Sequence, residues 1–176
     1  IPVNLANVAT VIRNAASMEM TGLELELMYQ VTEAWDLMVT YGYLEAEYKD
    51  YLADLTGDGI ITDNSGLIPR NTPENTFGLT TSYTTQIGQG ELKGRISYRF
   101  RDEMNTDSSN NPYGDLDSIE NVNATINYSF SDYSITLWGR NLTDEREQRW
   151  ATIGGLTSRG WWNEPQTLGI TFAASF

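Results

Sequence analysis

The stretch Gln166-Thr-Leu-Gly-Ile-Thr-Phe-Ala-Ala-Ser-Phe176 decides the fold class, because its residues alternate strictly in character. Apolar residues occupy every second position from Leu168 to Phe176, and Thr, Gly, Ala and Ser fill the positions between them. This alternation predicts a β-strand with one apolar face and one face of small residues. At the edge of a soluble sheet such a strand is a hazard, whereas a strand that closes a barrel is paired on both sides. The stretch therefore favours a β-barrel.

Six further stretches alternate in the same way. They cover residues 18–31, 35–48, 76–86, 91–101, 119–130 and 133–142. Charges such as Glu24, Arg95 and Arg140 fall on the polar faces, and the apolar positions from Leu23 to Tyr43 carry none. A charge that faces the centre of a bilayer costs about 2–4 kcal/mol, so one clean face per strand is expected of a membrane barrel. The stretches therefore predict an all-β, antiparallel transmembrane β-barrel.

The connections and the aromatic residues support the same prediction. Short connections alternate with long, polar segments at residues 49–75, 102–118 and 143–164, which are predicted to be loops. Aromatic residues gather at the strand ends and aliphatic residues in the middle, as in the two aromatic girdles of outer-membrane barrels. Seven strands are an odd number and fewer than the minimum of about eight for such barrels. The chain is therefore expected to be the C-terminal segment of a larger barrel.

Composition excludes several classes of function. The 176 residues contain no Cys and no His, which removes disulfides, thiolate or imidazole metal sites and most pairs of nucleophile and base. The net charge of −13 argues against a nucleic-acid partner, because the phosphate backbone would be repelled. No apolar run approaches the roughly 18–20 residues of a membrane-spanning helix. No catalytic constellation is present, so we expect no enzymatic activity.

An ordered series of motifs resembles the C-terminal part of the β-barrel domain of TonB-dependent outer-membrane receptors. The series is Gly22-Leu-Glu-Leu-Glu-Leu27, Tyr41-Gly-Tyr-Leu-Glu-Ala46, Ile68-Pro-Arg-Asn-Thr-Pro-Glu74, Asn121-Val-Asn-Ala124, Gly139-Arg-Asn-Leu-Thr-Asp-Glu145 and the terminal Phe176. The resemblance covers nearly all of residues 1–176 and implies a barrel of about 22 strands with a plugged lumen. The plug domain is absent from this sequence.

The resemblance also implies a function. Such a receptor captures a scarce nutrient (a siderophore, cobalamin or an oligosaccharide) at its external loops for uptake energised by the TonB complex, which the missing N-terminal part would contact. It resides in the Gram-negative outer membrane, among lipid and lipopolysaccharide. Two alternatives remain open on the sequence: a passive diffusion channel and, from a different class, a secreted β-rich binding or adhesion domain.

Phe172 and Phe176 resemble the C-terminal signal that the barrel-assembly machinery reads. The alternative is that both are girdle residues of the membrane face, and both roles are compatible.

Two groups of residues are candidates for binding the nutrient. A basic stripe follows the polar face of one predicted strand and consists of Lys93, Arg95, Arg99 and Arg101. It suits an anionic ligand such as a ferric siderophore, or it pairs with carboxylates of the plug or with other acidic residues of the lumen. The last long connection carries Trp150, Trp161 and Trp162 beside several arginines. These residues suit stacking on a sugar or an aromatic chelator, or else packing within the loop or against lipopolysaccharide.

The segment from Asp54 to Asp63 resembles the first half of a calcium-binding loop. Oxygen-bearing side chains occupy its positions one, three, five and ten, at Asp54, Thr56, Asp58 and Asp63. Ca²⁺ takes about six to eight oxygen ligands with flexible geometry. Ser65 stands at position twelve, where the pattern requires an acidic residue. Both a Ca²⁺ site and a solvated acidic loop remain open.

Overall fold

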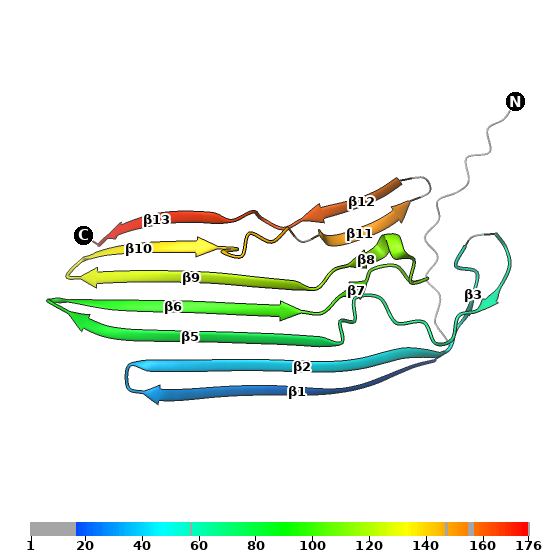
Figure 1. Cartoon of the computed structure of the whole chain (residues 1–176), viewed down its shortest axis with the longest axis horizontal. Helices are drawn as coiled ribbons and strands as arrows, with labels where there is room; N and C mark the ends of the chain where they lie inside the picture. Colours follow the sequence, from blue (N-terminus) through cyan, green and yellow to red (C-terminus); the bar gives the residue numbers. More distant parts are fainter. Residues whose placement is uncertain (1–16, 57, 147, 155–156, 176) are drawn as a thin grey trace, which may run out of the picture.

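The computed structural model describes residues 17–56, 58–146, 148–154 and 157–175. Its main element is a sheet of seven antiparallel strands, each paired with the one before it (Figure 1). These strands are β1 (Ser17–Thr32), β2 (Trp35–Asp50), β5 (Asn75–Ile87), β6 (Gly90–Arg101), β9 (Ile119–Phe130), β10 (Tyr133–Arg140) and β13 (Thr167–Ala174). All seven predicted strands are confirmed, and the sheet is open rather than closed into a barrel. Phe176 lies outside the described residues.

The short turns lie at one end of the sheet and the long connections at the other (Figure 1). Gly88 and Ser131 take positive φ angles of 63° and 46° in two of these turns. Two-residue hairpin turns require such angles so that the turn follows the twist of the strands. At the opposite end, β10 stops at Arg140, two residues earlier than predicted, because Asn141 takes a φ of 49° that a strand does not allow.

The sequence prediction treated the long connections as loops without further structure, and this was wrong. They contain β3 (Leu52–Ala53), β4 (Thr62–Asp63), β7 (Met104–Asn105), the 3₁₀ turn η1 (Pro112–Gly114), β8 (Asp115–Leu116), β11 (Gln148–Gly154) and β12 (Thr157–Trp162). These strands form three two-stranded hairpins. The strands of the first two hairpins have two residues each, which is too short to show alternation. Side-chain bonds of Asn and Thr to the backbone hold these two hairpins.

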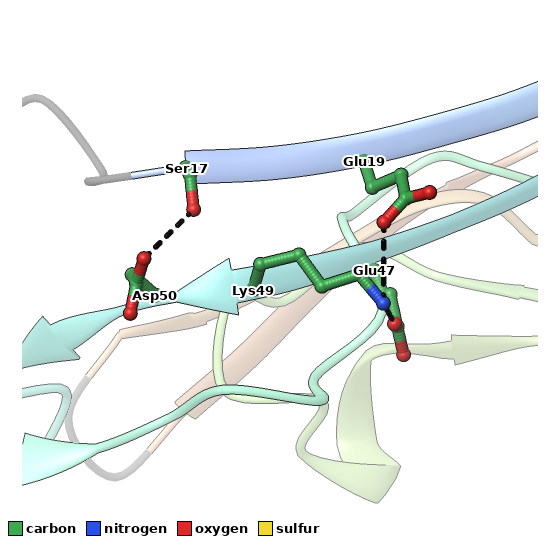
Figure 2. Close-up of polar contacts among 5 residues, drawn as sticks. All are labelled: Ser17, Glu19, Glu47, Lys49 and Asp50. Atoms are coloured by element: carbon green, nitrogen blue, oxygen red, sulfur yellow. Dashed lines mark hydrogen bonds and ion pairs between the residues drawn. The ribbon is translucent and has the colours of Figure 1, made fainter.

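The apolar face of the sheet ends abruptly toward the long connections. Leu23 and Tyr43 are paired in the register between β1 and β2, and the next pairs on this face are Thr21 with Glu45 and Glu19 with Glu47. Lys49 forms ion pairs with Glu19, at 3.3 Å, and with Glu47 (Figure 2). Exposed ion pairs of this kind contribute about 0–1 kcal/mol. The row of Leu23 and Tyr43 therefore marks the outer limit of the apolar band.

Aromatic rings line the opposite limit, beside the short turns. The ring centroids of Tyr128 and Phe130 are 5.7 Å apart, those of Phe130 and Tyr133 are 5.7 Å apart, and those of Tyr133 and Phe172 are 6.1 Å apart. This continuous row crosses three neighbouring strands. It matches the girdle predicted for this edge, and it places Phe172 within that girdle.

The buried side chains lie toward the long connections rather than in the middle of the sheet. Among the described residues, the buried hydrophobic ones are Leu116, at 2% exposure, and Ile119, at 7%. In the centre of the apolar face, by contrast, Leu25 and Ile170 are 57% and 74% exposed. No helix in the described part of the chain has the length and apolar character needed to cross a membrane.

Candidate functional site

The basic stripe lies on the polar face of the sheet, the face that carries Glu26, Thr40, Gly78 and Arg99. Pairing between neighbouring strands sets these four residues in one row across β1, β2, β5 and β6. Lys93, Arg95 and Arg101 occupy other rows of the same face on β6. The small residues Thr40 and Gly78 separate the acidic strand β1 from the basic strand β6. A side chain at Gly78 would fill this gap, because its Cβ would lie 2.5 Å from the Thr40 Oγ1.

A cavity of about 570 Å³ opens over this face at its long-connection end. Its lining includes Thr40, Gly78, Arg99, Arg101, Asn121, Asn123, Arg140, Asn141, Asn163 and Glu164. The structure thus brings Arg99 and Arg101 together with Arg140, which the sequence analysis did not identify as a binding residue. Lys93 and Arg95 belong to the same stripe but do not line this cavity.

The three arginines of the cavity differ in their partners. The Arg101 Nη1 donates to the Asp102 carbonyl at 3.0 Å, and its Nη2 donates to the Asp117 carbonyl at 3.1 Å. Arg101 therefore ties β6 to the connection that follows it. Within the part of the chain that the structure describes, the side chains of Arg99 and Arg140 form no hydrogen bond or ion pair. Glu164 lines the same cavity without forming an ion pair to a described arginine, so two guanidinium groups remain available to an anion.

A chain of asparagines forms one wall of the cavity. The Asn123 Nδ2 donates to the Asn121 Oδ1 at 2.8 Å, and the Asn121 Nδ2 donates to the Asn141 Oδ1 at 3.2 Å. Asn141 is only 4% exposed, and its Nδ2 donates to the carbonyls of Glu145 and Glu164 at 2.9 and 3.0 Å. Because these amides satisfy one another and the backbone, the wall is held in place before any ligand arrives. These bonds give Asn141, the first residue of the Asn141-Leu-Thr-Asp144 motif, a structural role.

The predicted tryptophan group falls on the hairpin of β11 and β12. Trp161 and Trp162 are 73% and 64% exposed. Trp162 lines a second hollow of about 270 Å³ with Arg146, Asn163 and Pro165, and Asn163 also lines the main cavity. Trp150 pairs with Trp161 through the backbone, and its side chain lies outside the described residues. A role of this group in stacking stays a prediction.

The calcium-like loop uses its carboxylates within the loop. The Asp54 Oδ2 accepts a hydrogen bond from the Gly59 backbone N–H at 2.7 Å, and the Asp58 Oδ1 accepts one from the Ile60 N–H at 2.8 Å. The described residues contain no group of three or more acidic side chains placed to hold a metal ion. Calcium binding by Asp54, Thr56, Asp58 and Asp63 stays a prediction.

Asp63 also stabilises a turn in this loop. Its Oδ1 accepts hydrogen bonds from the Ser65 hydroxyl at 2.6 Å and from the Ser65 backbone N–H at 3.0 Å. Both bonds favour the ionised carboxylate and lower the pKa of Asp63 below its usual value.

Residues 2–142 match the family described as "TonB dependent receptor-like, beta-barrel". Receptors of this family are outer-membrane β-barrel proteins that act in transport rather than as enzymes.

Several solved structures resemble the chain, and three of them are receptors for siderophores or their iron complexes. The ferric yersiniabactin uptake receptor FyuA from Yersinia pestis has a TM-score of 0.78 at 18% identity, over 93% of this chain and 24% of that receptor. The siderophore receptor PiuA from Acinetobacter baumannii has a TM-score of 0.72 at 21% identity, over 88% of this chain and 21% of that receptor.

The third is BauA, the ferric preacinetobactin receptor of Acinetobacter baumannii, with a TM-score of 0.67 at 20% identity, over 90% of this chain and 22% of that receptor. At these identities the three likenesses show the fold alone. The chain spans about a quarter or less of each receptor.

Proposed function

Because this chain belongs to the TonB-dependent receptor β-barrel family, we propose that the complete protein is an outer-membrane receptor that takes up a scarce nutrient with energy from the TonB complex. In this proposal the chain forms one wall of the barrel, with its polar face toward the lumen and its apolar face toward lipid. The TonB complex would be contacted through the part of the protein that precedes these residues.

We propose further that the nutrient is anionic, with a ferric siderophore as the preferred class over cobalamin or an oligosaccharide. The observation that carries this proposal is the pair formed by Arg99 and Arg140, which line the cavity without a described counter-ion. A charge-assisted hydrogen bond from a guanidinium to an anionic oxygen is about twice as strong as a neutral one. The solved receptors for ferric yersiniabactin and ferric preacinetobactin support the siderophore class.

Three further contacts belong to the proposal. Lipid and lipopolysaccharide would surround the apolar face, and the barrel-assembly machinery would read Phe172 and Phe176 during insertion. Ca²⁺ would bind the loop of Asp54 and Asp58 only if their carboxylates exchanged backbone hydrogen bonds for the metal.

Uptake by cells that lack their own iron-chelate receptors tests the proposed function. Cells that produce the complete protein are given ferric yersiniabactin, ferric preacinetobactin, cobalamin or a maltodextrin, and the uptake of each is measured. We expect uptake of a ferric chelate that depends on TonB. Uptake that persists without TonB would indicate a passive channel instead.

Charge reversal tests the anionic class. Arg99→Glu should lower the affinity for the ferric chelate by at least about tenfold, since a hydrogen bond to a charged group contributes about 1.5–3 kcal/mol. Arg140→Glu tests the second arginine that lines the cavity. Lys93→Glu is the matched control, because Lys93 shares the strand and the face but does not line the cavity. Unchanged affinity in both Arg99→Glu and Arg140→Glu would contradict the anion proposal. The arginines would then pair with carboxylates of the plug or of the lumen.

A further inference from the structure

Trp138 on β10 is held flat against the polar face of the sheet. It pairs in register with Gly169 of β13. A Cβ atom at Gly169 would lie 2.2 Å from the Trp138 Cζ2, so the missing side chain is what allows the indole to lie there. The Trp138 Nε1 donates to the Thr171 Oγ1 at 3.1 Å. The indole is therefore fixed both by the glycine beneath it and by a hydrogen bond to the next strand.

Arg140 lies two residues further along the same face of β10, and its side chain lies over this indole. The Arg140 Cζ is 5.3 Å from the centroid of the Trp138 ring. At this separation the negative ring face attracts the guanidinium. The ring carries no net charge and does not occupy the N–H donors in the plane of the guanidinium, so Arg140 stays able to bind an anion.

The register places Arg140 and Arg99 on either side of β9. Arg99 pairs with Asn121, and Gly139 pairs with Ala124, so that Arg140 lies beside Asn123. With strands about 4.8 Å apart and a rise of about 3.4 Å per residue, the Cα atoms of the two arginines are roughly 12 Å apart. Both long side chains line the same cavity and can reach one group above the asparagine wall.

We propose that Trp138 is a positioning residue, which holds Arg140 over the cavity so that Arg140 and Arg99 together bind one anionic group with two or more oxygen atoms, of the carboxylate or phosphate class. This inference rests on the proposed function, because it assigns the cavity to a transported anion. Glu164 lines the same cavity and is the competing partner for Arg140. In this proposal Trp138 keeps Arg140 from turning toward this carboxylate. The absence of a side chain at Gly169 leaves room for the indole.

Chemical modification of arginine tests the proposal on the complete receptor in detergent, with inorganic phosphate as the probe. Phenylglyoxal labels accessible arginines, and mass spectrometry gives the labelling rate at each one. In the wild-type protein we expect phosphate to slow the labelling of Arg99 and Arg140 by at least threefold. In Trp138→Leu, and independently in Gly169→Ala, the protection of Arg140 should be lost. Trp138→Phe should restore it, because phenylalanine keeps the ring face.

Three labelling outcomes would overturn the proposal. Equal protection of Arg140 in Trp138→Leu and the wild type would show that the indole does not position it. Absence of protection at both arginines, or absence of labelling even without phosphate, would show that the cavity is not open to an anion. Heat-modifiable gel mobility confirms that each variant is folded. Failure of uptake with intact, tryptophan-dependent protection would overturn only the proposed function, whereas protection of Arg99 without any effect of Trp138 would overturn only this inference.

Discussion

In the seven-stranded sheet, neighbouring strands satisfy the polar groups of the backbone, and side chains such as Leu25 and Ile170 remain more than half exposed on the apolar face. At the long connections the pattern is reversed, because Leu116 and Asn141 are almost completely buried and single side chains hold distant segments together. The two regions are therefore stabilised in different ways. The sheet depends on the medium around its apolar face, and the connections depend on a few individual hydrogen bonds.

The largest effect is expected from a charge on the apolar face of the sheet. Leu79→Arg should lower the free energy of unfolding by about 2–4 kcal/mol, because the charge would face the middle of the bilayer. Ser82→Arg, on the polar face of the same strand, is the control and should change it by less than about 1 kcal/mol. Urea unfolding of the complete receptor in lipid vesicles measures both. Equal costs at the two positions would contradict the assignment of the faces.

In the connections, removal of the Asn141 side chain should have the largest effect. Asn141→Gly keeps the positive φ of 49° but removes the bonds to the carbonyls of Glu145 and Glu164. A buried group left without its partner costs about 1–3 kcal/mol, so proteolytic cleavage within residues 143–164 should speed up by about five- to a hundredfold.

Asn71→Gly is the matched control for this change, since Asn71 is exposed and also takes a positive φ, of 60°. A similar rate of cleavage in both variants would mean that Asn141 does not anchor the connection.

A smaller effect is expected where two long connections meet. The Ile68 N–H donates to the Asn110 Oδ1 at 2.8 Å, and the Asn110 Nδ2 donates to the Ile68 carbonyl at 2.7 Å. Asn110→Gly should cost about 1 kcal/mol, a typical net value for a hydrogen bond, and raise hydrogen exchange at the Ile68 amide about fivefold. If exchange at Ile68 stayed as slow as in Asn71→Gly, the two connections would not be joined by this pair of bonds.

The smallest effect concerns the exposed turn of Asp63. Because its bonds with Ser65 lower the pKa of Asp63, the stabilisation is fully present above the usual aspartate pKa of 3.8 and is lost as pH falls through the lowered value. Pepsin cleavage within residues 52–65, normalised to cleavage elsewhere, should therefore rise only below pH 3.8. Ser65→Ala should make this rise smaller, because the pKa of Asp63 would then lie closer to its usual value. An unchanged profile in Ser65→Ala would exclude these hydrogen bonds as its cause.

The same difference between the regions explains what could be predicted from the sequence. The strand Ile119–Phe130 was predicted with its observed bounds, because alternation over twelve residues reports directly on the two environments of its faces. The hairpin of β3 and β4 has two residues in each strand and gives no such signal. The hairpin is held by hydrogen bonds such as the one that the Asn64 Nδ2 donates to the Ala53 carbonyl, at 3.0 Å.

The candidate site was predictable only within one strand. The stripe from Lys93 to Arg101 lies on a single stretch of sequence, so its shared face follows from parity. Arg140 lies two strands away, and only the register of β6, β9 and β10 brings it to the cavity of Arg99. The same register reveals the fit between Trp138 and Gly169. The sequence alone does not indicate that Trp138 and Gly169 are neighbours.

Cysteine labelling along β9 tests most directly whether one face of the sheet lines an aqueous lumen and the other contacts lipid. The chain contains no cysteine, so single cysteines at each of residues 121–127 report individually in an otherwise cysteine-free receptor in vesicles. A charged, water-soluble thiol reagent should label residues 121, 123, 125 and 127 and leave residues 122, 124 and 126 unlabelled. Labelling that is uniform along the strand, or that follows the opposite parity, would contradict the account.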